Sequence, residues 1–251
     1  MTEVQFYGYG LAGVHDTHLP GKLIVLEGPD GVGRSTQIAL LREWLEASGY
    51  AVFSSGLRRS ELASVGIEEA KKGHTLGNLT MALFYAVDFA DRLEREIIPA
   101  LRAGFVVLTD RYMYSLIARA IVRGVDEKWI RSLMGFALVP DAIFYLKSDV
   151  EHLIPRVLGS RGFDYWESGM DFLGNPDYYE SFIDYQTRML SVFAALSKEY
   201  GFIEIDANQS IRQVFVSLRE HIAEIVRELK PTQIEALLPQ ASDPPEPKTT
   251  T

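Results

Sequence analysis

The stretch that most constrains the fold of this chain is an apolar run at residues 23–27, which is followed by a glycine-rich turn and a helix-forming segment. The turn and helix start fit the pattern G-x-x-x-x-G-K-[ST], except that Arg34 stands where lysine is expected. Glycines let successive N–H groups point inward at a polyanion, and a helix N-terminus adds its partial positive charge. The sequence therefore predicts a phosphate-binding loop rather than an ordinary tight turn.

The residues expected to hold phosphate groups are those of the turn and the first helical positions. They are Gly28, Pro29, Asp30, Gly31, Val32, Gly33, Arg34, Ser35 and Thr36. The hydroxyl of Ser35 is placed to bind Mg²⁺, as the serine or threonine of such loops does.

Length and composition limit the alternatives. A chain of 251 residues suits one domain of about 200 residues with tails. Its net charge of −9 argues against a broad nucleic-acid or membrane surface. The absence of cysteine excludes disulfides, thiol catalysis and cysteine-bound metals. With no signal-peptide pattern and no apolar run near the about 18 residues of a membrane span, a cytoplasmic location is expected.

Apolar runs of strand type alternate with helical periods along most of the chain. The expected strands are residues 23–27, 51–54, 105–109, 142–146 and 202–205. This alternation predicts an α/β fold with a five-stranded, mostly parallel sheet, helices on both faces and a site at the carboxyl ends of the strands. With the phosphate-binding loop, it indicates the three-layer P-loop NTPase fold.

The domain is expected at residues 21–230, between an N-terminal extension at 1–20 and a disordered tail at 231–251. Within the domain, residues 159–176 have no clean period and mix charged with aromatic side chains. Long irregular segments in compact domains are often functional loops, so a lid is expected over about residues 156–176.

Charged residues follow two of the expected strands. Asp110 ends the third strand and is placed like an acid that holds a metal through water or steadies the surroundings of an acceptor phosphate. Arg111 beside it offers a planar fork for a phosphate. A salt-bridged strand end is the alternative for this pair. Arg58 and Arg59 form a basic loop after the second strand, which either faces phosphate or is simply solvated.

With these residues in hand, the chain resembles the thymidylate kinase family of P-loop nucleoside-monophosphate kinases over about residues 22–229. The matching segments are 27–37, 83–88, 99–104, 109–112 with Ser115, 140–141 and 205–207. The resemblance implies that ATP and dTMP react to ADP and dTDP with Mg²⁺ as cofactor. It also implies a homodimer whose ligands are nucleotides, whereas the acidic net charge argues against nucleic acid or membrane as partners.

The resemblance also assigns roles by position. Asp30 would lie near the acceptor's sugar and transferred phosphate, and Arg111 would bind the acceptor phosphate. Tyr85 would stack on the base, and Ala207 would line the adenine pocket. Catalytic arginines would come from the lid, at Arg156 and Arg161, because residues 30–33 carry no basic side chain.

The expected site is thus the following set. Catalytic roles fall to Asp30, Arg34, Asp110, Arg111, Arg156 and Arg161; substrate contacts to Arg58, Tyr85, Phe89, Arg111, Ser115 and Arg119; and metal binding to Ser35 and Asp110.

Several positions depart from the family pattern. Arg34 replaces the loop lysine, Phe89 stands where an arginine is aimed at the acceptor nucleotide, and Arg119 begins a segment where the family has Tyr-Gln-Gly. A pocket that hydrogen-bonds a base discriminates strongly, so these changes bear on specificity more than on fold. Two other hypotheses stay open: a catalytically weakened homologue that only binds nucleotide, and a kinase of a different nucleotide or small-molecule acceptor.

Overall fold

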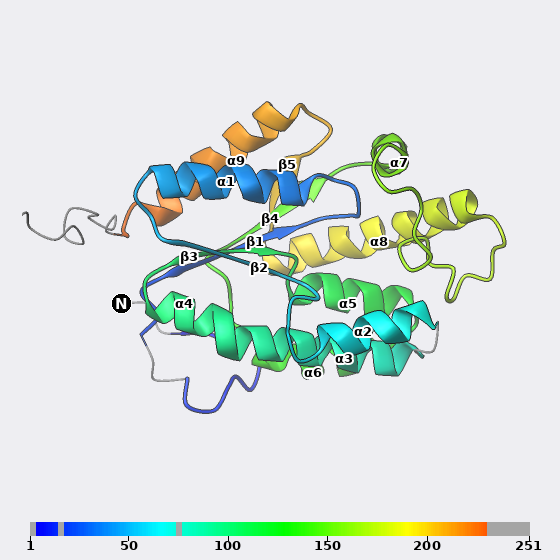
Figure 1. The fold of residues 1–251 in the computed structure, drawn as a ribbon, viewed down its shortest axis with the longest axis horizontal. Helices are drawn as coiled ribbons and strands as arrows, with labels where there is room; N and C mark the ends of the chain where they lie inside the picture. Colours follow the sequence, from blue (N-terminus) through cyan, green and yellow to red (C-terminus); the bar gives the residue numbers. More distant parts are fainter. Residues whose placement is uncertain (1–3, 15–17, 74–76, 230–251) are drawn as a thin grey trace, which may run out of the picture.

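The computed structural model describes residues 4–14, 18–73 and 77–229, and its centre is a single five-stranded sheet (Figure 1). The strands lie in the order β2-β3-β1-β4-β5, and each adjacent pair is parallel. Their bounds are β1 (Lys22–Glu27), β2 (Val52–Gly56), β3 (Val106–Asp110), β4 (Ala142–Lys147) and β5 (Ile203–Asp206). The predicted α/β fold is confirmed, and the sheet is parallel throughout.

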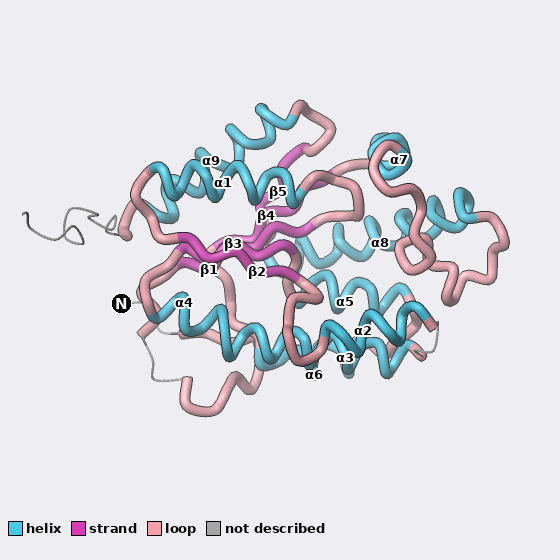
Figure 2. Tube along the Cα trace, in the orientation of Figure 1, coloured by secondary structure: helices cyan, strands magenta, loops and turns pink. Residues whose placement is uncertain are grey.

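Helices cover both faces of this sheet, as Figure 2 shows with helices in cyan and strands in magenta. One face is covered by α1 (Arg34–Ala47) and α9 (Ile211–Val226), with α7 (Val150–Leu158) beside them. The opposite face is covered by α3 (Asn78–Arg92), α4 (Ile98–Arg102), α5 (Met113–Val122), α6 (Glu127–Leu133) and α8 (Tyr178–Tyr200), with α2 (Ser64–Lys72) packed outside α3. Short helices η1 (Leu93–Ile97) and η2 (Met134–Phe136) complete the order. Each face thus has its own buried apolar cluster.

The apolar strands explain this layering. In β1, Ile24 and Leu26 belong to the cluster under α1 and α9, whereas Leu23 and Val25 belong to the cluster on the other face. Successive side chains of a strand point to opposite faces, and a sheet covered on both sides needs apolar residues at every position.

Strand register brings three loops to one edge of the sheet. Asp110, the last residue of β3, is level with Leu26 of β1 and with Gly56 of β2. The chain segments that follow β1, β2 and β3 therefore emerge side by side at the carboxyl edge. This is the edge at which open α/β sheets bind ligands.

Helix α3 continues directly into the π-helical segment η1 and then into α4. Leu83 and Val87, on the outer face of α3, are 42% and 47% exposed. The buried face of α3 instead carries Tyr85, Asp88 and Phe89. Apolar residues on both faces of α3 hide its true orientation from a periodicity argument.

The N-terminal segment packs against the domain in its described part. Phe6 forms an isolated antiparallel bridge with Leu138, and the hydroxyl of Tyr7 lies 2.6 Å from that of Tyr114. The predicted disordered tail at 231–251 lies outside the described residues. None of the helices described is both long and apolar enough to cross a membrane.

Candidate active site

The turn after β1 has the backbone conformation of an anion-binding loop. Gly28, Gly31 and Gly33 all have positive φ angles, of 149°, 79° and 99°. A Cβ atom on Gly28 would lie 2.7 Å from the carbonyl oxygen of Leu146, and one on Gly31 would lie 2.6 Å from Val157. Only glycine therefore fits these two positions. Helix α1 starts at once, and no side chain caps its N-terminus, so its first N–H groups remain available to an anion.

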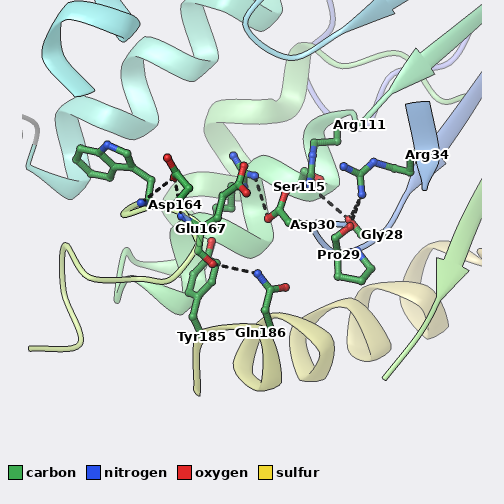
Figure 3. A network of polar contacts seen from close by, with 12 residues as sticks. Gly28, Pro29, Asp30, Arg34, Arg111, Ser115, Asp164, Glu167, Tyr185 and Gln186 are labelled. Carbon is green, nitrogen blue, oxygen red and sulfur yellow. Dashed lines mark hydrogen bonds and ion pairs between the residues drawn. The ribbon is translucent and has the colours of Figure 1, made fainter. Parts of the chain in front are cut away.

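Arg34 turns back under this loop. Its Nε donates to Asp110 at 2.7 Å. Its Nη1 donates to the carbonyl oxygens of Gly28 at 2.6 Å and Pro29 at 2.5 Å (Figure 3). The guanidinium thus ties the beginning of the loop to the acid that ends β3. Sequence reasoning expected this charge near the donor phosphates and did not anticipate these contacts.

Asp110 and Ser35 meet on the cleft side of this link. The Ser35 hydroxyl donates to the Asp110 carboxylate at 3.1 Å. Burial raises the pKa of Asp110, but the charges of Arg34 and Arg111 outweigh burial and the net pKa is lowered. The carboxylate is therefore ionised at neutral pH and available as a hard oxygen ligand.

These two oxygens fit magnesium. The described residues hold no cluster of three or more carboxylate, histidine or cysteine groups suited to a metal. Mg²⁺ does not need one, since it commonly takes one or two protein oxygens and fills its other positions with phosphate oxygens and water.

Arg111 forms a second anchor on the same loop. Its Nη2 is hydrogen-bonded to Asp30, and its Nη1 donates to Ser115 at 3.0 Å and to the carbonyl oxygen of Gly28 at 3.2 Å. Arg119 also approaches Asp30, at 3.5 Å. Although burial raises the pKa of Asp30, the surrounding arginines lower it overall. Asp30 is thus a buried anion held among guanidinium groups.

Ser115 lies beneath the cleft. It is fully buried, and its hydroxyl donates to Glu27 at 2.6 Å while accepting from Arg111. Glu27 also accepts the backbone N–H of Tyr112, and burial raises the pKa of its carboxyl group. Ser115 is therefore placed to orient Arg111, and direct contact with an acceptor stays a prediction.

A cleft of about 480 Å³ opens above these residues. Its lining joins the phosphate loop, the loop after β2, the ends of β3 and α5, and the irregular segment after α7. The charged residues that line it are Asp30, Arg34, Arg58, Arg59, Lys71, Asp110, Arg111, Arg119, Arg156, Arg161 and Glu167. All six of the predicted catalytic and substrate arginines therefore share one cavity.

The expected lid arginines have partners in this state. The Nη2 of Arg156 donates to the carbonyl oxygen of Ala207 at 2.9 Å, and Arg161 is hydrogen-bonded to Glu167. Ala207 is 2% exposed and is not part of the cleft lining described above. Its observed role is to hold Arg156, and its contact with adenine stays a prediction.

Tyr85 and Phe89, one helical turn apart, lie in different surroundings. Tyr85 lines a small pocket with Arg119 next to the cleft. Phe89 is fully buried, with its ring centroid 4.7 Å from that of Tyr112 and 5.3 Å from that of Phe136. The expectation that Phe89 contacts the acceptor is therefore corrected, because its ring packs into the core.

Sequence reasoning did not include three charged residues in the site. Lys71 and Glu167 line the cleft, and burial raises the pKa of Glu167. Asp88 accepts the backbone N–H groups of Arg58 and Ser60, each at 3.0 Å, and so shapes the basic loop. The sequence does not indicate that Lys71 belongs to the site, because this lysine stands in a run of mixed charges at the end of a short helix.

The parallel sheet, the glycine loop and the strand-end acid together define a P-loop kinase. Comparison with known proteins narrows this class, because the model of the thymidylate kinase family matches residues 26–218. The chain belongs to the thymidylate kinase family.

Individual relatives agree with this assignment. The chain is 38% identical over 208 residues to a protein of Saccharolobus solfataricus named probable thymidylate kinase 2, covering 82% of this chain and 97% of the relative. It is 30% identical to a thymidylate kinase of Brachyspira hyodysenteriae, covering 87% and 100%. A probable thymidylate kinase of Methanocaldococcus jannaschii is 34% identical, covering 76% and 90%.

Proposed function

We propose that this protein transfers the γ-phosphoryl group of ATP to the 5′-phosphate of dTMP and releases ADP and dTDP. The observation that carries the proposal is the convergence of Arg111 and Arg119 on Asp30, beside a glycine loop whose N–H groups are free to bind phosphate. Phosphoryl transfer needs mainly positioning and neutralised charge. Membership of the thymidylate kinase family supports dTMP as the acceptor.

Roles follow from these positions. The loop at residues 28–36 would hold the donor phosphates, and Arg111 would bind the acceptor phosphate once its contacts with Asp30 loosen. Ser35 and Asp110 would hold Mg²⁺, which would screen the phosphate charges. Arg156 and Arg161 would exchange their present partners for the transferred group as the lid closes. A cytoplasmic location goes with these soluble substrates and stays part of the proposal.

The test is ADP formation from ATP and Mg²⁺ with dTMP, dUMP, dCMP and purine monophosphates as acceptors. We expect turnover to be highest with dTMP and to depend on Mg²⁺. The variant Asp110→Asn should lower turnover more than about 100-fold and keep the circular dichroism spectrum of the wild type. Absence of turnover with every monophosphate would contradict the proposal.

The contacts of Arg34 favour a second candidate, a homologue that binds nucleotide with weakened catalysis. Its guanidinium is engaged by the Asp110 carboxylate and by the carbonyl oxygens of Gly28 and Pro29, at the position where such a loop usually carries a lysine for the phosphates. Tight binding of ATP without ADP formation, together with activity gained by Arg34→Lys, would favour this candidate over an active kinase.

A homodimer is also part of the proposal. Leu79, Leu83 and Val87 recur on one face of α3 and are between 42% and 56% exposed. Side chains four residues apart line the same face of a helix, so these three form one apolar stripe. Contiguous exposed apolar surface of this kind is typical of a protein interface.

A further inference from the structure

An unassigned ammonium group lies at the end of the cleft beyond the phosphate-binding residues. It belongs to Lys71, near the C-terminus of α2, and its Nζ is 5.8 Å from the ring centroid of Tyr85 and 5.5 Å from that of Trp166. A lysine held between two aromatic rings in this way has little of the freedom of a surface lysine.

The place of Lys71 in the cleft matters for the acceptor. Asp30 and Arg111 form an ion pair where the phosphate and sugar of an acceptor would be held. Arg119 contacts Asp30 and also lines the small neighbouring pocket with Tyr85. Lys71 lies over the ring of Tyr85, so it is the residue of this row that is farthest from the phosphate position. A nucleotide with its phosphate at Arg111 and its base at Tyr85 would therefore present the outer edge of the base to Lys71.

The core position of Phe89 leaves the base pocket without a donor from that part of α3. Phe89 packs among aromatic rings and offers no hydrogen bond to the cleft. Lys71 lines the cleft and has three N–H donors. Burial lowers the pKa of Lys71, which indicates that its ammonium group has lost much of its water and gains from an acceptor oxygen.

We propose that Lys71 reads the acceptor base by donating to a carbonyl oxygen on the outer edge of a pyrimidine that lies against Tyr85. Thymine and uracil present such an oxygen, whereas cytosine presents an amino group whose N–H bonds oppose the ammonium. Lys71 is thus a specificity-determining residue for keto pyrimidines. The inference rests on the proposed function for the placement of the nucleotide.

Trp166 links this contact to the lid. Its indole N–H donates to the carbonyl oxygen of Lys71 at 3.3 Å, and the ring lies beside the ammonium group. Trp166 belongs to the irregular segment that also carries Arg161 and Glu167. A base bound to Lys71 would therefore lie beside the residue whose carbonyl oxygen accepts the Trp166 hydrogen bond, which holds the lid against α2.

The experiment compares Lys71→Met with Lys72→Met in full-length protein. Lys72 is the next residue, but its side chain is 69% exposed and pairs with Glu69, which makes it a matched control. Loss of a hydrogen bond from a charged donor should lower kcat/KM for dTMP about 10- to 100-fold in Lys71→Met, mainly through KM. The KM for ATP and the kcat/KM for dCMP should each change less than about threefold. The preference for dTMP over dCMP, measured as the ratio of their kcat/KM values, should therefore shrink. Lys71→Arg should recover part of the loss, and Lys72→Met should match the wild type.

Binding of the nucleosides thymidine and deoxycytidine by calorimetry separates this inference from the proposed function. If the wild type turns over dTMP while Lys71→Met keeps its full preference for dTMP over dCMP, the inference is overturned and the proposed function stands. If the wild type phosphorylates none of the monophosphates but binds thymidine more tightly than Lys71→Met does, the proposed function is overturned and the base contact stands. Equal losses for dTMP and dCMP would show that Lys71 is merely structural.

Discussion

Arg34 occupies the position at which a phosphate-binding loop usually carries lysine, and its guanidinium makes contacts that an ammonium cannot match in geometry. A planar fork can face the Asp110 carboxylate through Nε and two loop carbonyls through Nη1 at once. Lysine has a single nitrogen at the end of its chain. At this position arginine therefore acts on the shape of the loop as well as on its charge.

The first prediction concerns this residue. Arg34→Met should lower the free energy of unfolding by about 3 kcal/mol, because it leaves the largely buried Asp110 carboxylate without its partner. Urea denaturation followed by circular dichroism measures the change. The matched control is Arg42→Met in the same helix, where the pair with Glu46 is about half exposed and the loss should stay below about 0.5 kcal/mol. Equal stability of the two variants would contradict a structural role for Arg34.

Some residues of the site could be predicted from the sequence and others could not. The glycine loop, Asp110 and Arg111 could be predicted because their backbone and strand-end positions restrict them strongly. Phe89 could not be assigned to the core, since its place in the pattern matches a residue that faces the acceptor. Lys71 was missed because long-range packing of α2 against Trp166, rather than any local motif, brings it to the cleft.

At the scale of elements, the buried face of α3 holds a pair that would ordinarily be expected on a surface. Asp88 and Arg92 are one helical turn apart, both side chains are fully buried, and the bond from Nε to the carboxylate is 3.1 Å. The Asp88 carboxylate also accepts the backbone N–H groups of Arg58 and Ser60. Helix α3 thus fixes the basic loop after β2 through a side chain in its own interior face.

A comparison of two aspartates tests this element. Asp88→Ala should cost about 3 to 5 kcal/mol of stability, because it leaves the buried Arg92 unpaired. Asp184→Ala removes the same type of pair, with Arg188 one turn along α8, where both side chains are about half exposed, and should cost at most about 0.5 kcal/mol. Thermal and urea unfolding give both values. In assays at permissive temperature, Asp88→Ala should also raise the KM for dTMP; an unchanged KM would show that the loop is held by other contacts.

At the scale of the whole molecule, the parallel sheet could be predicted in full outline, because strands buried on both faces have unmistakable apolar runs. What the sequence left open is which helix faces meet solvent. Leu83 and Val87 are as apolar as their buried neighbours, and only the packing of α3 on α2 and α5 decides their exposure.

That exposure leads to a prediction about assembly. Leu83→Glu should shift the proposed homodimer toward monomer, because it places a charge in the middle of the apolar stripe on α3. Light scattering after size-exclusion chromatography measures the mass. Ile211→Glu serves as the control, since Ile211 is 60% exposed at the start of α9 and away from the stripe. If the Leu83→Glu and wild-type proteins have the same mass, this stripe is not the interface.

The two ends of the described chain share one location. Val4, Gln5, Glu228 and Leu229 line a single groove with Lys22 and Asp141, which begin β1 and precede β4 at the amino edge of the sheet. The phosphate loop follows the opposite, carboxyl edge. An anchor joined near either end would therefore leave the cleft facing away from the support. The molecule is in this respect suited to oriented attachment on a sensor surface, with nucleotide exchange unhindered.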